Sequence, residues 1–113
     1  MTSEQAGWMS ICAIGDIVPS TGVCALVGSE QVAVFRIGEE LYAIDNLDPC
    51  SGAAVLSRGL VGSLGERVVV ASPIHKQHFD LRTGECLEQP QQAVRTWAVR
   101  RQGEDVQVER RDT

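Results

Sequence analysis

The fold is decided by residues 23–45, VCALVGSEQVAVFRIGEELYAID. Apolar and β-branched residues form runs at 23–27, 31–37 and 41–44, separated by the turn residues Gly28-Ser29 and Gly38-Glu39. Runs of this length, bounded by glycine, are typical of strands and too short for ordinary helices. The stretch therefore predicts a three-stranded antiparallel meander.

The same pattern continues on both sides of this meander. A short helix is expected only within residues 53–64, where nearby glycines weaken it. The remaining elements are single strands at 8–12 and 67–71, a hairpin of 78–81 with 85–88, and a hairpin of 96–101 with 106–109. Many short strands with close turns predict an all-β antiparallel sandwich or small barrel.

Length and charge exclude several classes of protein. The 113 residues fit a single domain, 1–113. Ten Lys and Arg against fifteen Asp and Glu give a net charge of −5, the wrong sign for binding nucleic acid. No apolar run is long enough to span a bilayer, and the first residues lack a secretory signal. We therefore expect a cytoplasmic protein with no membrane or nucleic-acid partner.

The four cysteines, Cys12, Cys24, Cys50 and Cys86, form no C-x-x-C pair. Cys12 and Cys24 have apolar neighbours, so both are predicted to pack in the core as small hydrophobic residues. Disulfides are not expected in the cytoplasm.

Two loops combine a proline with polar, ligand-type side chains at predicted strand ends. They are DPCSG, residues 48–52, and SPIH, residues 72–75, and the octet HFDLRTGE follows at 78–85. These segments resemble the Rieske family, whose motifs are C-x-H, C-x-x-H and a downstream F-D-x-x-T-G-E. The resemblance covers about residues 8–109. It implies a Rieske-like sandwich or barrel with a small inserted two-loop subdomain, here about residues 46–88.

The ligand positions of that motif fall on Asp48, Cys50, Ser72 and His75. A Rieske centre needs two cysteine thiolates and two histidine nitrogens, and only His75 matches its expected type. Asp48 and Ser72 offer hard oxygen atoms where soft sulfur is required. The resemblance therefore implies a vestigial site without its own [2Fe–2S] cluster.

Other roles for these residues remain open from the sequence. Asp48, Cys50 and His75 could together hold a zinc ion, which is the less favoured reading because no complete ligand set is visible. Cys50 is expected to be a partly buried, unreactive thiol, since no neighbouring cysteine or lysine lowers its pKa. His78 is expected at a strand edge or on the surface.

No catalytic motif replaces the missing ligands, so we expect no independent catalysis. Among Rieske-like proteins, the chain resembles the small-subunit family (NirD type) of assimilatory NAD(P)H-dependent nitrite reductases. The resemblance implies an accessory role. The partner would be a large subunit that carries FAD, an iron–sulfur cluster and sirohaem and reduces nitrite to ammonium. The alternatives are a Rieske-type ferredoxin electron carrier and a small Cys/His metal-binding module.

The two loops also suggest a contact surface for that large subunit. Prolines stiffen the loops, and rigid loops lose less conformational entropy on docking. The residues expected to make this contact are Pro49, Pro73, Ile74, His75 and Phe79. The alternative is that these apolar groups pack inward beneath the loops.

Overall fold

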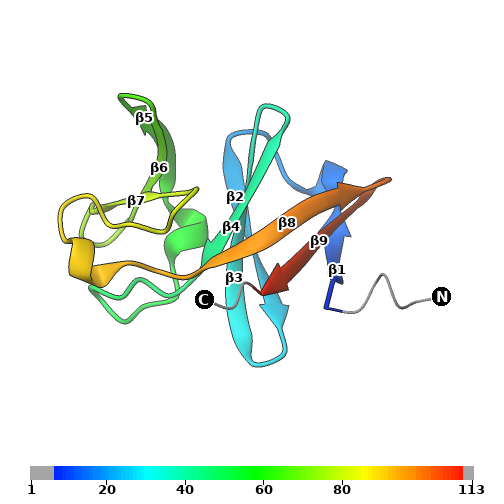
Figure 1. Cartoon of the computed structure of the whole chain (residues 1–113), viewed down its shortest axis with the longest axis horizontal. Coiled ribbons are helices and arrows are strands. Elements are labelled where there is room, and N and C mark those ends of the chain that lie inside the picture. Colours follow the sequence, from blue (N-terminus) through cyan, green and yellow to red (C-terminus); the bar gives the residue numbers. More distant parts are fainter. Residues whose placement is uncertain (1–6, 111–113) are drawn as a thin grey trace.

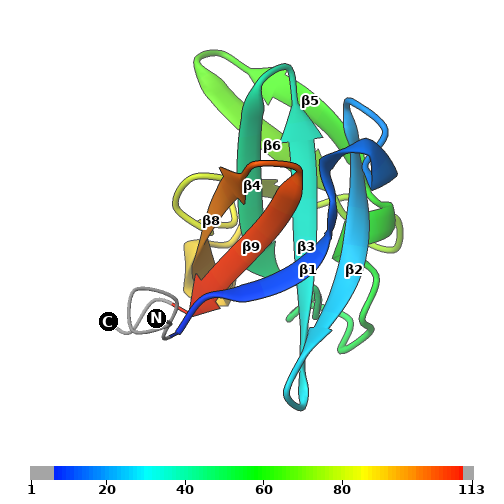
Figure 2. The ribbon, with the colours of Figure 1, turned by 90° about the vertical axis from the view of Figure 1, so that its right-hand side faces the viewer.

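The computed structural model describes residues 7–110 of the chain, which form two antiparallel sheets (Figure 1). The larger sheet has six strands in the spatial order β1-β9-β8-β4-β3-β2. Their bounds are β1 (Met9–Ala13), β9 (Asp105–Arg110), β8 (Thr96–Gln102), β4 (Glu40–Asp45), β3 (Glu30–Ile37) and β2 (Thr21–Val27). The sheet curls until its edge strands β1 and β2 approach each other (Figure 2). The antiparallel all-β prediction is thus confirmed.

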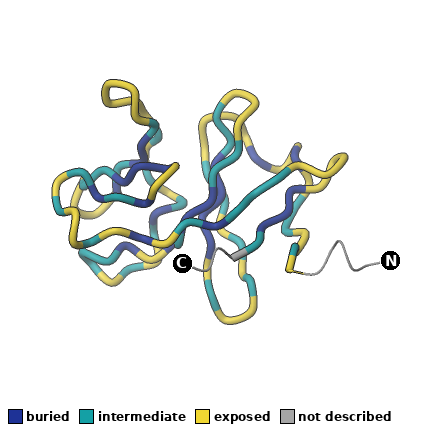
Figure 3. Tube along the Cα trace, viewed as in Figure 1, coloured by how far each residue is buried: buried dark blue, intermediate teal, exposed yellow. Residues whose placement is uncertain are grey.

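The predicted meander is β2, β3 and β4. Its two turns join Val27 to Glu30 and Ile37 to Glu40 in register, and Gly28 and Gly38 supply the positive φ angles that such tight turns require. Strand β3 is fully buried from Val32 to Phe35 (Figure 3). Because side chains alternate across a strand, β3 contributes to a core on each side of the sheet.

The two cores divide the apolar side chains between them. One lies inside the curled sheet, with Val32 and Val34 packed against Trp97 of β8. The other lies between β3 and the smaller sheet, and includes Phe35 and Phe79. The smaller sheet therefore packs on the face of β3 that points away from the inside of the curled sheet.

The smaller sheet contains β5 (Leu60–Leu64), β6 (Arg67–Ala71) and β7 (His78–Asp80), in that order. Short 3-10 helices lie outside the sheets at η2 (Ile14–Asp16), η3 (Leu56–Arg58) and η4 (Pro90–Gln92). The helix expected within residues 53–64 is reduced to η3, and the expectation is wrong for 60–64, which pair with β6. Cross-strand pairing there outweighs the weak local propensity.

The cysteine predictions have different outcomes. Cys12 is half-buried against the core of the curled sheet, whereas Cys24 is exposed, so its predicted core position is wrong. Cys24 lies on the edge strand β2, where it pairs with Ala33 of β3. The side chains of Gln31 and Asn46 are neighbours of its thiol. All four cysteines are free. No helix among residues 7–110 is long and apolar enough to cross a membrane.

Candidate functional site

The first loop follows β4 and is closed by Asp48. The Asp48 N–H donates to the Ala53 carbonyl at 2.8 Å, and the Gly52 N–H donates to the Asp48 carbonyl at 2.7 Å. The carboxylate atom Oδ1 accepts the Cys50 N–H at 2.8 Å. Aspartate commonly closes a turn in this way, so Asp48 satisfies the backbone of its own loop.

The second loop follows β6 and is closed in a similar way by Ser72. The Ser72 N–H donates to the Gln77 carbonyl at 2.8 Å, and the Lys76 N–H donates to the Ser72 carbonyl at 3.0 Å. The Ser72 hydroxyl oxygen accepts the Ile74 N–H at 3.3 Å. Each loop is therefore organised by the residue at its first motif position.

These two residues also connect the loops to each other. The Ser72 hydroxyl donates to Oδ2 of Asp48 at 2.5 Å, and both side chains have 0% exposure. Hydrogen bonds from a hydroxyl to a carboxylate are short and strong, more so away from water. We call this buried pair the Asp48–Ser72 clasp. It occupies the two positions at which the Rieske motif has its cysteines.

The clasp controls the protonation of Asp48. Burial alone would raise the pKa of this carboxyl, but hydrogen bonds from the Ser72 hydroxyl and the Cys50 N–H favour the charged form and lower the pKa below its usual value. The carboxylate is therefore ionised at neutral pH and acts as an acceptor only.

Cys50 is half-buried, and its thiol lies close to that of the buried Cys86. Burial raises the pKa of the Cys50 thiol, and the negative charge of Asp48 raises it further. This agrees with the expectation of a partly buried thiol whose pKa is not lowered. The neighbouring Cys86 lies 36 positions away in sequence, so spacing gave no sign of it.

The exposed part of the site comes from the second loop. Pro73 and His75 are exposed and Ile74 is 47% exposed, whereas Pro49 is half-buried. Phe79 differs from the expected contact set because its ring is completely buried in the core beneath the loops. Its neighbours on β7 alternate between faces, and Phe79 is on the inward face. The inward alternative therefore holds for Phe79.

His78 lies at the start of β7 and is half-buried, as expected for a strand-edge residue. Its Nδ1 atom lies 2.6 Å from Oε2 of Glu88, and the other carboxylate oxygen of Glu88 accepts the His78 N–H. This engagement directs the ring toward Glu88.

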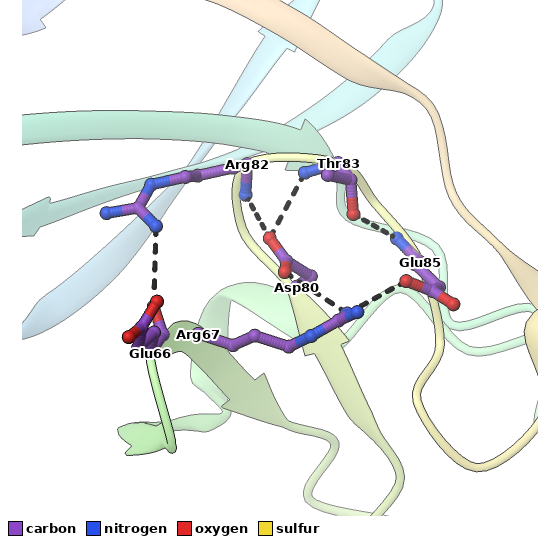
Figure 4. A network of polar contacts seen from close by, with 6 residues as sticks. All are labelled: Glu66, Arg67, Asp80, Arg82, Thr83 and Glu85. Atoms are coloured by element: carbon purple, nitrogen blue, oxygen red, sulfur yellow. Dashed lines mark hydrogen bonds and ion pairs between the residues drawn. The ribbon is translucent and has the colours of Figure 1, made fainter.

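The octet 78–85 forms a structural network (Figure 4). Asp80 is nearly buried, and its Oδ1 accepts the N–H groups of Arg82 and Thr83 at 2.7 and 3.2 Å. Arg67 of β6 reaches both Asp80 and Glu85, at 3.4 and 2.8 Å. These contacts fix the β7 turn to β6, so this motif supports the loops.

Gly84 is required at this turn for two reasons. Its φ is +81°, and a Cβ atom placed there would lie 2.0 Å from the carbonyl oxygen of Val94. The Gly84 carbonyl in turn accepts the Val94 N–H at 2.9 Å. The glycine of the octet thus lets the chain that leads to β8 pass directly against the turn.

Asn46 supports the first loop but carried no signal in the sequence. Its side chain is buried; Oδ1 accepts the Ser57 N–H at 2.7 Å and Nδ2 donates to Gln31 at 3.1 Å. It therefore joins β3, η3 and the loop, a role that depends on contacts distant in sequence.

The donor set does not fit a Rieske cluster. Asp48 and Ser72 present hard oxygen atoms, which are hydrogen-bonded to each other. His75 lies on the exposed side of its loop. Among residues 7–110, no three His, Cys, Asp or Glu side chains are grouped so that they could hold a metal ion. In the described part of the chain, Asp48, Cys50 and His75 therefore do not come together as a zinc site.

Comparison with known proteins identifies the family. A model of the Rieske-like [2Fe-2S] domain matches residues 7–109. The nitrite reductase (NADH) small subunit of Salmonella typhimurium is 48% identical over 95 residues, covering 82% of this chain and 88% of that protein. The NMR structure of Escherichia coli NirD has a TM-score of 0.83 at 46% identity and covers 89% of this chain and 94% of that one.

Two further similarities extend this picture. The NAD(P)H nitrite reductase large subunit of Klebsiella oxytoca is 45% identical over 93 residues, which are 82% of this chain but 10% of that protein. The anthranilate 1,2-dioxygenase ferredoxin subunit of Burkholderia cepacia is 39% identical over 80 residues, 70% of this chain and 68% of that protein. The fold, the coverage and the identities together show that this chain belongs to the Rieske-like domain family and, within it, to the nitrite reductase small subunits.

Proposed function

We propose that this chain is the accessory small subunit of a cytoplasmic NAD(P)H-dependent nitrite reductase, and that it holds no [2Fe–2S] cluster. The observation that carries the second part is the Asp48–Ser72 clasp, which engages both cysteine positions of the motif in a buried hydrogen bond. The small-subunit relatives support the first part.

The partner in this proposal is the large subunit. Support comes from Klebsiella oxytoca, where a region homologous to this chain lies within the large subunit itself. A domain that occurs covalently joined to a protein in one organism is a natural non-covalent partner of it in another. The FAD, iron–sulfur cluster and sirohaem needed to reduce nitrite to ammonium would then belong to the large subunit.

The proposed contact is the second loop, around Pro73, Ile74 and His75, with Pro49 at its border. These residues combine an exposed apolar side chain with a backbone held by Ser72, so little conformational freedom is lost on binding. We leave Phe79 out of the proposed contact, because its ring is buried in the core beneath the loops.

The docking test is co-purification of the tagged full-length chain with the large subunit, followed by a nitrite reduction assay with and without the chain. Ile74→Asp should weaken the complex by about tenfold or more, since it places a charge in an apolar contact. Leu26→Asp is the matched control, because Leu26 is 71% exposed on β2. Equal affinity of both variants and the wild type would remove this loop from the interface.

The cluster test compares wild-type protein with the triple variant Asp48→Cys/Cys50→His/Ser72→Cys, both prepared anaerobically with iron and sulfide. The triple variant restores C-x-H and C-x-x-H with His75 as the fourth ligand. We expect colourless wild-type protein and a brown variant with a [2Fe–2S] spectrum. Two irons and two labile sulfides in the wild type would instead support the ferredoxin alternative, which the Burkholderia relative favours. Stoichiometric zinc lost on Cys50→Ser would support the metal-binding module.

A further inference from the structure

Strand β5 is an exposed edge of the smaller sheet. The hairpin of β5 and β6 projects from the body of the molecule (Figure 1), and within residues 7–110 only β6 pairs with β5. Leu60 is 80% exposed and Leu64 is 43% exposed. No charged residue or proline lies between residues 59 and 65. Edge strands usually carry such residues to prevent pairing with another chain, so this edge lacks the common protection.

The hydrogen bonds of β6 identify the free backbone groups of β5. The Val68 carbonyl accepts the Leu81 N–H at 2.9 Å, away from β5, so Val68 and its partner Ser63 form a non-hydrogen-bonded pair. Bonding alternates along an antiparallel ladder. Residues 60, 62 and 64 therefore bond to β6, while the N–H and C=O groups of Val61 and Ser63 point outward.

Neither the backbone conformation nor any contact within the described chain requires a glycine at position 62, the centre of β5. Its φ is not positive, and a Cβ atom added there would meet no atom within 4 Å. A glycine inside a strand often marks the close approach of another backbone. Here it lines a shallow groove of about 240 Å³, together with Leu60 and Leu64 of β5 and with residues of β6 and β7 on the same face of the small sheet.

We propose that β5 pairs with β5 of a second copy of this chain, antiparallel and centred on Gly62. In this register Leu60 of one copy lies opposite Leu64 of the other, on the same face. Residues 61 and 63 then exchange hydrogen bonds across the two-fold axis, and the two glycines meet at a non-hydrogen-bonded position. The two small sheets become one continuous sheet.

Charge complementarity favours a second copy as the occupant. The same register carries the exposed Arg58, just before β5, toward the exposed Glu66 at the hairpin turn of the other copy. The two-fold axis repeats this contact, which gives two Arg58–Glu66 pairs, each of opposite charges. Because five-residue strands bury less area than stable dimer interfaces, the dimer is weak, with a Kd of about 10 µM to 1 mM.

The first test is sedimentation of the full-length chain across this concentration range. Ser63→Pro removes an outward N–H without touching the bonds to β6, whereas Ser63→Thr keeps it. We expect Ser63→Pro to raise the Kd about tenfold or more and Ser63→Thr to leave it unchanged. A wild-type chain that stays monomeric to about 1 mM, or a proline variant that dimerises normally, would overturn the proposal.

The second test uses charge reversal and does not depend on the edge substitution. Arg58→Glu and Glu66→Arg should each weaken self-association, because each places like charges opposite one another. An equimolar mixture of the two variants should dimerise at the wild-type level, since every pair is again of opposite sign. A mixture no better than either variant overturns this register. Loss of large-subunit binding by Ser63→Pro with unchanged self-association would assign the edge to the large subunit instead.

Discussion

Removal of the Ser72 hydroxyl is the most direct perturbation of the Asp48–Ser72 clasp. Ser72→Ala deletes the 2.5 Å hydrogen bond and leaves Oδ2 of a carboxylate with 0% exposure without that donor. A hydrogen bond to a charged group contributes about 1.5–3 kcal/mol, and an unsatisfied buried acceptor costs a comparable amount. We therefore expect the free energy of unfolding to fall by about 2–3 kcal/mol.

The assay is urea denaturation followed by tryptophan fluorescence and circular dichroism, with Ser29→Ala as a control. Ser29 is an exposed turn serine, so its change should stay within about 0.5 kcal/mol. A double-mutant cycle with Asp48→Ala should give a coupling of about 1–3 kcal/mol. If Ser72→Ala behaves like the control, or the two changes are additive, the clasp does not stabilise the loops.

The clasp also predicts a dependence on pH. The pKa of Asp48 is lowered in the folded state, so its contribution is complete above the unfolded pKa of about 3.9 and is lost as the pH falls through the folded value. Wild-type protein should therefore be more stable than Asp48→Asn at neutral pH, with a difference that narrows in acid. A difference that stays constant from neutral pH down to about pH 2 would contradict an ionised Asp48.

Two other features give predictions of their own. Gly84→Ala should destabilise the chain by more than about 3 kcal/mol, because its Cβ would meet the Val94 carbonyl at a φ of +81°; thermal melting at the wild-type temperature would contradict this. Alkylation by iodoacetamide followed by mass spectrometry should modify the exposed Cys24 first, Cys50 more slowly because of its raised pKa, and Cys86 only on unfolding; equal rates for Cys24 and Cys50 would count against the burial of Cys50.

Local patterns were sufficient wherever neighbours in sequence determine the structure. The meander at 23–45 and the turn at Gly84 follow from alternation and from glycine at tight turns, and both are present. The strand at Leu60–Leu64 was missed because Gly59, Gly62 and Gly65 interrupt its pattern, while its order comes from pairing with β6.

The site depended on contacts that a one-dimensional pattern does not contain. Asp48 and Ser72 could be identified as motif positions, but their bond joins residues 24 positions apart and forms only when both loops are in place. The inward position of Phe79 and the proximity of Cys50 to Cys86 are also set by packing between the sheets. These tertiary effects override the expectation from residue type alone.

The clasp has a consequence for how this protein matures. In the clasp, the two loops are joined by side-chain atoms of the polypeptide itself. If the chain holds no cluster, as we propose, completing this region requires no delivery of iron or sulfide. Its assembly would then be independent of the cell's supply of iron and insensitive to damage of a cluster by oxygen.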